Sequence, residues 1–162
     1  MKRPRDSQRS RLYAAEKAAF GDPRDCALRL ASMRELQDYV AAAVTDDWFR
    51  AEFGRFASLR VKDGRGTRHA YSAYDPHSGR VLLSFPRWAR TRPVVLHELG
   101  HAASVQRHGM IAAHGPEFAA VFLQLAGRYL GEPAARCLRD AYRAHRVRYA
   151  PECGGAVDWV GR

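Results

Sequence analysis

The central stretch of the chain reads Val94-Val95-Leu96-His97-Glu98-Leu99-Gly100-His101-Ala102. Its apolar positions predict a buried helix, and on a helix residues four apart lie on one face, about one turn from each other. His97 and His101 can therefore present both imidazoles to one metal ion, and Glu98 lies close enough to reach a water beside that ion. This pattern is typical of a helical zinc site in which the carboxylate acts as the general base.

The residues on either side of this stretch predict the ends of the helix. Thr91 suits the N-cap, and Pro93 is tolerated in the first turn. Gly109 suits the position where a left-handed residue ends a helix. We interpret His108, directly before it, as a C-terminal cap, because a cation is favourable there.

A catalytic zinc site needs a third protein ligand and keeps a fourth position for water. His108 does not qualify, since seven residues at 1.5 Å rise would place it about 10 Å beyond His101 along the helix axis. The metzincin pattern fails as well, because Ser104 and Arg107 occupy the places of its glycine and its third histidine.

The next histidine stands in the segment His114-Gly115-Pro116-Glu117-Phe118. Six extended residues span up to about 20 Å, so the chain after the helix can fold back to the level of His101. His114 can therefore be the third ligand. Glu117 stays open as a replacement or supplement, since two histidines and a glutamate also form catalytic zinc sites.

These two motifs resemble those of the SprT-like (Spartan-like) metalloproteases, over roughly residues 91 to 130. The resemblance implies a zincin-like fold, Zn²⁺ bound by His97, His101 and His114, and Glu98 as the catalytic base. Farther upstream, the segments 5–9 and 13–16 look more like a small, uncharacterised family of metallohydrolases from actinobacteria and their phages.

The length of 162 residues, with 46% hydrophobic and 10% aromatic residues, predicts one globular domain over residues 1–162, with irregular tails at 1–6 and 151–162. Three scattered cysteines, Cys26, Cys137 and Cys153, do not suggest a disulfide framework. We find neither a secretory signal nor a run long enough to cross a membrane. We therefore expect a soluble cytoplasmic protein, monomeric by default.

Periodicity predicts the remaining elements. Helices are expected over 7–20, from Met33 to Val44, in a short segment that ends at Gly54, and from Pro116 and Glu132 onward. Strands are expected over 57–62, 67–74 and 80–85, joined by turns at 63–66 and 75–79. The fold class is thus α+β, with a small antiparallel three-stranded sheet beside a helical bundle that carries the metal helix. His69 and His77 are expected at the surface, where His69 could still contact a substrate.

The sequence predicts zinc-dependent hydrolysis of peptide bonds in a protein or peptide substrate, with Glu98 moving the proton. The strand 81–85 could pair through an exposed edge with an extended peptide, or it could be an ordinary core strand. One alternative is a zinc hydrolase that acts on a non-peptide amide.

A second alternative is a nucleic-acid-binding protein with a structural zinc, since the net charge of +10 favours polyanions. On the last predicted helix, four arginines recur at a spacing of three to four residues and could bind DNA weakly and without sequence preference. They are Arg136, Arg139, Arg143 and Arg146. Structural zinc sites usually close with four protein ligands, so the enzyme is the favoured interpretation.

Overall fold

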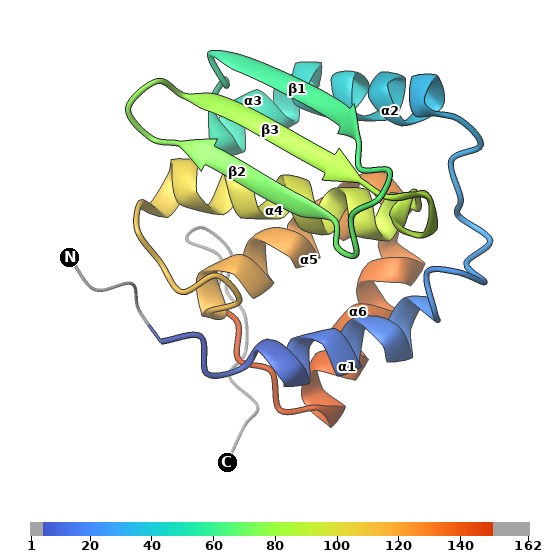
Figure 1. Cartoon of the computed structure of the whole chain (residues 1–162). Coiled ribbons are helices and arrows are strands. Elements are labelled where there is room, and N and C mark those ends of the chain that lie inside the picture. The colour runs from blue at the N-terminus through green and yellow to red at the C-terminus, as the bar shows by residue number, and fades with distance from the viewer. Residues whose placement is uncertain (1–4, 151–162) are drawn as a thin grey trace.

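Six α-helices accompany one three-stranded sheet in the computed structural model, which describes residues 5–150 (Figure 1). The α+β class is confirmed. In chain order the elements are α1 (Arg9–Phe20), α2 (Met33–Thr45), α3 (Asp47–Phe53), β1 (Ser58–Asp63), β2 (Tyr71–Asp75), β3 (Arg80–Phe85), the 3-10 turn η1 (Arg87–Ala89), α4 (Arg92–His108), α5 (Pro116–Leu130) and α6 (Glu132–Ala144). The predicted tail from residue 151, Cys153 and residues 1–4 lie outside the described residues.

The helices begin and end at the residues that local chemistry favours. The Ser32 hydroxyl accepts a hydrogen bond from the Glu35 amide at the start of α2, and the Asp46 carboxylate accepts one from Trp48 at the start of α3. Gly109 ends α4 with a φ of 73°, as predicted. Thr91 occupies the N-cap of α4, although its side chain makes no capping hydrogen bond.

The strand order is β1-β3-β2, so the predicted antiparallel meander is wrong. β3 is central. It runs parallel to β1, with Ser58 opposite Arg80, and antiparallel to β2, with Tyr71 opposite Ser84. Both edges of β3 are therefore paired within the sheet, so of the two interpretations left open for this strand, the core strand is confirmed and the exposed edge for a substrate peptide is wrong.

The side-chain pattern gives the physical reason for this order. In β3 only Arg80 and Leu82 are not buried, whereas β1 and β2 have no fully buried residue and alternate between exposed and half-buried ones, except at the last two residues of β1, which are both exposed. A nearly continuous apolar run suits a central strand, and an alternating pattern suits an edge. The turn after Asp63 carries the chain past the end of β3, where the Gly64 amide donates to the Phe85 carbonyl. A Cβ on Gly64 would lie 2.7 Å from the backbone nitrogen of Pro86, so glycine is required there.

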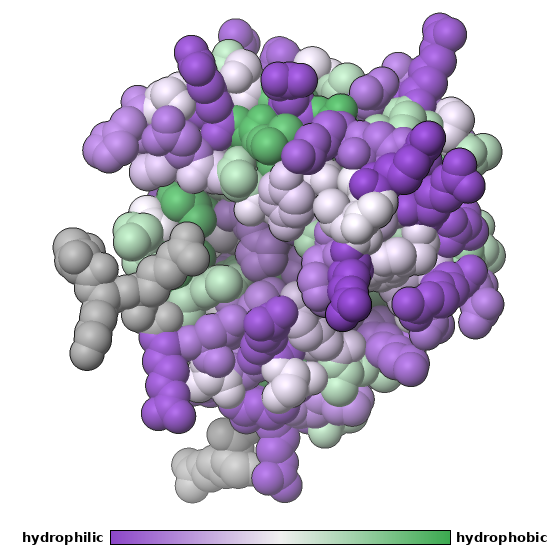
Figure 2. Space-filling view, in the orientation of Figure 1, coloured by the Kyte–Doolittle hydropathy of each residue, from purple (hydrophilic) through white to green (hydrophobic). Residues whose placement is uncertain are grey.

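α4 packs against the sheet on one side and against α5 on the other, while α5 packs on α6 and α6 on α1 (Figure 1). Buried apolar residues of α4, among them Leu96 and Leu99, form the centre of the core with Phe118 and Phe122 of α5. The face of the molecule in Figure 2 is covered mostly by hydrophilic side chains. Among the described residues, no helix has the length and apolar character needed to cross a membrane.

Candidate metal centre

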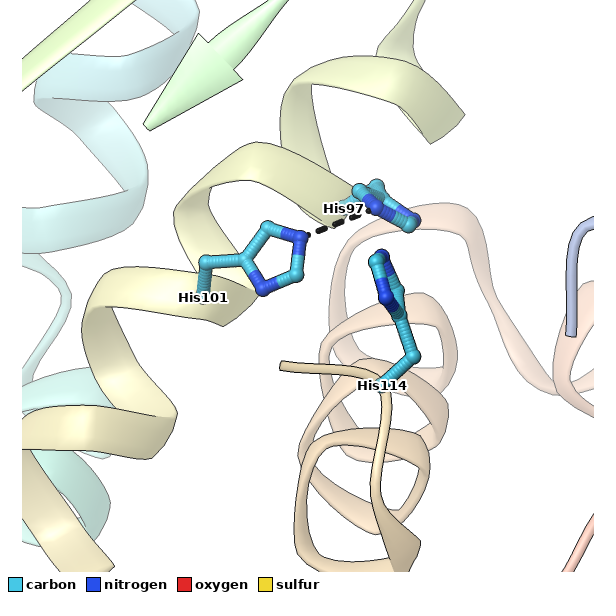
Figure 3. A group of neighbouring side chains, drawn as sticks. All are labelled: His97, His101 and His114. Carbon is cyan, nitrogen blue, oxygen red and sulfur yellow. Dashed lines mark hydrogen bonds between the residues drawn. The ribbon is translucent and has the colours of Figure 1, made fainter. Parts of the chain in front are cut away.

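Three histidines meet between α4 and the start of α5. His97 and His101 project from successive turns of α4, and His114 lies in the turn that precedes α5 (Figure 3). One ring nitrogen of each lies within 4.8 Å of the others. The fold-back predicted after Gly109 therefore occurs, and the Gly115 amide closes it by donating to the Ala112 carbonyl at 3.0 Å.

The atoms of this cluster have the chemistry of a metal site. His97 and His114 are 3% and 5% exposed. The Nε2 atoms of His97 and His101 are 3.1 Å apart, and the Nε2 of His114 is buried without a hydrogen-bond partner. An unpaired buried polar atom costs about 1–3 kcal/mol. One cation placed between the rings would give all three nitrogens a partner, so the residues fit a metal ion, and imidazole suits several divalent transition metals.

Aromatic rings hold the imidazoles in place. Phe118 stacks on His101 with ring centroids 4.3 Å apart, and Tyr13 of α1 stacks on His97 at 5.5 Å. Tyr13 is also 5.1 Å from the ring of His114. The cluster thus lies between α5 and α1, with little freedom for the rings to turn.

The environment favours the neutral form of His97 and His101, which is the form that binds metal. Burial is the main cause that lowers the pKa of His97 to about 3, and the charges of His114 and Arg9 act in the same direction. Burial likewise lowers the pKa of His101, with further contributions from His97 and His114. Protons therefore compete weakly for these two nitrogens near neutral pH.

Glu98 lies beside the cluster but outside it. It is 8% exposed, and burial, followed by the negative charge of Glu16, raises its pKa to about 8. Burial also raises the pKa of Glu16 to about 8, opposed by His114. A bound cation would oppose this effect of burial, because its positive charge lowers the pKa of nearby carboxyl groups and favours their ionised form. Glu98 is thus a buried carboxyl group beside three histidines that could hold a metal ion.

A cleft of about 440 Å³ opens from His97 and Glu98. α1 forms one wall, with Tyr13 among its residues, and the first turns of α4 form the other. Away from the histidines the lining is largely apolar, with Phe20, Pro23, Ala70, Trp88 and Val94. The volume is in the range of small-molecule and side-chain pockets. His69, for which a substrate contact was left open, also lines this cleft.

The other residues considered as ligands lie elsewhere. Within residues 5–150, the group able to hold a metal comprises His97, His101 and His114. His108 is exposed at the end of α4, and Glu117 acts electrostatically on His108. The structure therefore groups His114, and not Glu117, with His97 and His101.

Two carboxylates contact the cluster without having been predicted. Glu16 Oε1 is 2.8 Å from His97 Nδ1, and Asp6 Oδ2 is 2.7 Å from His114 Nδ1. Glu16 had a signal in the sequence: it is an acidic residue one helical turn after Leu12, and so lies next to the buried face of α1. For Asp6, which precedes the helix, the sequence offers no comparable signal.

The arginines considered for DNA binding are only partly grouped. Arg136, Arg139 and Arg143 lie on α6, but Arg146 follows its end with a φ of 54°. Arg139 pairs with Glu132 and Arg143 with Asp140. Helix α1 lies beside this region, because Arg11 donates to the Arg146 carbonyl at 3.1 Å.

Comparisons with protein-family models, with curated proteins and with solved structures found no match to this chain. The function must therefore be inferred from the chemistry of the cluster and the cleft. The resemblance of the two histidine motifs to SprT-like metalloproteases stays a prediction.

Proposed function

We propose that the chain is a zinc-dependent metallohydrolase, and specifically a metallopeptidase, in which His97, His101 and His114 hold the metal and Glu98 is the general base. The observation that carries the proposal is the meeting of three ring nitrogens within 4.8 Å, one of them buried and unpartnered. The resemblance of both motifs to SprT-like proteases supports the same assignment and a zincin-like relationship for the fold.

Zinc is the metal that this ligand set favours when combined with the neighbouring glutamate. Three imidazoles with one position left for water are a common catalytic zinc arrangement, and His-Glu-x-x-His on a helix is its peptidase form. When bound, zinc supplies Lewis acidity toward water and toward a carbonyl oxygen.

Glu98 would carry the proton through the reaction. It follows His97 directly on α4 and lines the cleft, so its carboxylate can accept a proton from the attacking water. Once it has taken this proton, Glu98 can donate it to the leaving nitrogen.

The cleft would take the substrate next to the bond that is cut. Its reactive end lies at His97 and Glu98, and its far walls are apolar, formed by side chains such as Phe20 and Trp88. The indole of Trp88 is fixed, because its nitrogen donates to the Arg68 carbonyl at 3.2 Å. A peptide with a large apolar side chain beside the scissile bond fits this shape better than a strongly polar one.

The alternatives use the same residues differently. A hydrolase of non-peptide amides would need the same ligands and the same base, so only substrates distinguish it. A nucleic-acid-binding protein with a structural zinc has less support, because such sites usually close with four protein ligands, whereas this cluster has three beside a glutamate and a cleft.

The test combines metal analysis with a substrate screen. The zinc content per chain would be measured by mass spectrometry for the wild type and for Glu98→Gln, and both would be incubated with a mixed peptide library and a panel of small amides. We expect one zinc per chain in both proteins and peptide cleavage by the wild type alone. Loss of zinc from Glu98→Gln would overturn its role as base, and cleavage restricted to small amides would favour the amidohydrolase.

A further inference from the structure

We infer that Asp6 and Glu16 are positioning residues of the metal centre, which hold His114 and His97 with the Nε2 of each ring directed at the metal position. The inference rests on the proposed metal site, but it does not depend on which bond the protein cleaves. Both carboxylates come from the N-terminal segment and lie 108 and 81 residues from the histidines that they contact.

The contacts determine which nitrogen of each ring carries the hydrogen. A bound cation favours the ionised form of both carboxylates, and an ionised carboxylate can only accept, so at 2.8 Å from Glu16 and 2.7 Å from Asp6 each Nδ1 is then the donor. A neutral imidazole with hydrogen on Nδ1 has its lone pair on Nε2. These are the atoms that face the centre of the cluster, including the unpartnered Nε2 of His114.

The third ring is held in another way. His101 makes a hydrogen bond to the backbone of Ala113 and stacks on Phe118, so it needs no side chain from α1. Ligating histidines commonly use their second nitrogen on a carboxylate or a backbone carbonyl, which fixes the ring and raises its basicity. In this cluster, His97 and His114 use a carboxylate in this way, and His101 uses the backbone.

A purely structural role would be to attach α1 to the rest of the protein, but other contacts already do this. The Gln8 side chain, 1% exposed, both donates to and accepts from the backbone of Arg148, at 2.9 and 3.0 Å. Arg11 adds the bond to Arg146. Gln8→Ala therefore offers a control that removes an anchor at the start of α1 and leaves both carboxylates that contact the histidines in place.

The test measures metal binding by the full-length chain. Zinc would be removed, the visible spectrum would be recorded during titration with Co²⁺, and the zinc affinity would be measured against a chelator. We expect Asp6→Ala and Glu16→Ala to weaken zinc binding by about 10–100-fold and to alter the Co²⁺ spectrum. Glu16→Gln should lose less, since its amide oxygen can still accept from Nδ1. Gln8→Ala should change neither readout, although its melting temperature should fall.

A nitrogen-detected NMR spectrum of the zinc-free protein adds a readout that packing alone would not move. Wild-type His97 and His114 should carry hydrogen on Nδ1, and the alanine variants should lose this preference. The inference is wrong if affinity, spectrum and tautomer stay as in the wild type, or if Gln8→Ala changes them equally. A wild-type chain that binds neither metal would overturn the proposed function as well, whereas metal loss in the variants without any peptidase activity would overturn the reaction alone.

Discussion

The two sides of α4 are built in opposite ways. On the sheet side, Val81, Leu83 and Phe85 are buried among other apolar groups, and the strand between β1 and β2 has both edges paired. On the other side, titratable groups such as His97 and Glu98 are buried next to the apolar contacts with α5, and the Nε2 of His114 has no partner. The sheet side therefore contributes stability by itself, whereas the histidine side costs stability until a cation binds.

Substitution of Glu98 should have the largest effect on activity, and it should leave both the apolar packing and the metal binding of α4 unchanged. We expect Glu98→Gln to lower kcat by about 10²- to 10⁴-fold, which is the usual contribution of a general base, and to leave the zinc content unchanged. Steady-state kinetics on a peptide found in the library screen would measure this. Glu52→Gln, a substitution of the same type on α3, is the matched control and should retain full activity.

Removal of the third ligand should break the histidine side alone. We expect His114→Ala to weaken zinc binding by several orders of magnitude, because a site with two ligands remains. His108→Ala should hardly change it, since His108 is exposed at the end of α4. Competition with a chelator measures both affinities. Zinc release by Glu117→Ala, with retention by His114→Ala, would contradict the assignment.

A core substitution should damage the sheet side alone. Leu83 is fully buried in β3, so Leu83→Ala should lower the free energy of unfolding by about 2–5 kcal/mol. Leu28→Ala, at a position that is 37% exposed, should have little effect. Urea denaturation of the zinc-loaded protein measures both changes. Equal losses at the two positions would contradict the burial argument.

Removal of zinc should sharpen the contrast between the two sides. A ligand that binds only the folded state adds about 2.7 kcal/mol at 100 times its dissociation constant, so the wild type should be destabilised by an amount of that order when a chelator is added. The same increment is expected in Leu83→Ala, because distant sites contribute additively. It should vanish in His114→Ala. Denaturation curves of the three proteins with and without chelator would measure these changes in the free energy of unfolding. A wild type whose stability does not depend on zinc would contradict the prediction.

The two sides also differ in how far they follow from the sequence. The histidine cluster depends on local geometry: His97 and His101 are one helical turn apart, and Gly109 ends the helix soon enough for His114 to return. The order of the strands depends instead on which strands pair. Asp63-Gly64-Arg65-Gly66 is an equally good signal for a hairpin and for a chain that crosses the end of a third strand.

The missed carboxylates have the same physical origin as the missed strand order. Asp6 and Glu16 reach the cluster only because α1 packs on α6 and brings the beginning of the chain to its centre. Such contacts are set by the packing of the whole domain, so spacing within one segment cannot predict them. The apolar run of β3 favoured a central position in the sheet, but the same run is also compatible with the last strand of a meander when helices cover that strand.

The smallest expected effect concerns DNA, which the alternative function would bind through the arginines of α6. For duplex DNA, the slope of log affinity against log salt concentration falls by about 0.9 for each phosphate that the protein no longer neutralises. The double variant Arg139→Gln with Arg143→Gln should reduce the slope by less than the loss of two phosphate contacts would reduce it. The reason is that Arg139 pairs with Glu132 and Arg143 with Asp140, so both side chains are only partly free to bind phosphates.

The control for this last experiment needs the same change of charge on another surface. Arg34→Gln with Arg60→Gln provides it, because both side chains are exposed, on α2 and β1. Titrations of duplex and single-stranded DNA across salt concentrations should show a smaller slope for the α6 pair than for the control pair. If both pairs lower the slope equally, any binding reflects the net charge of +10 rather than a site on α6, and an unchanged slope would remove α6 from the interface.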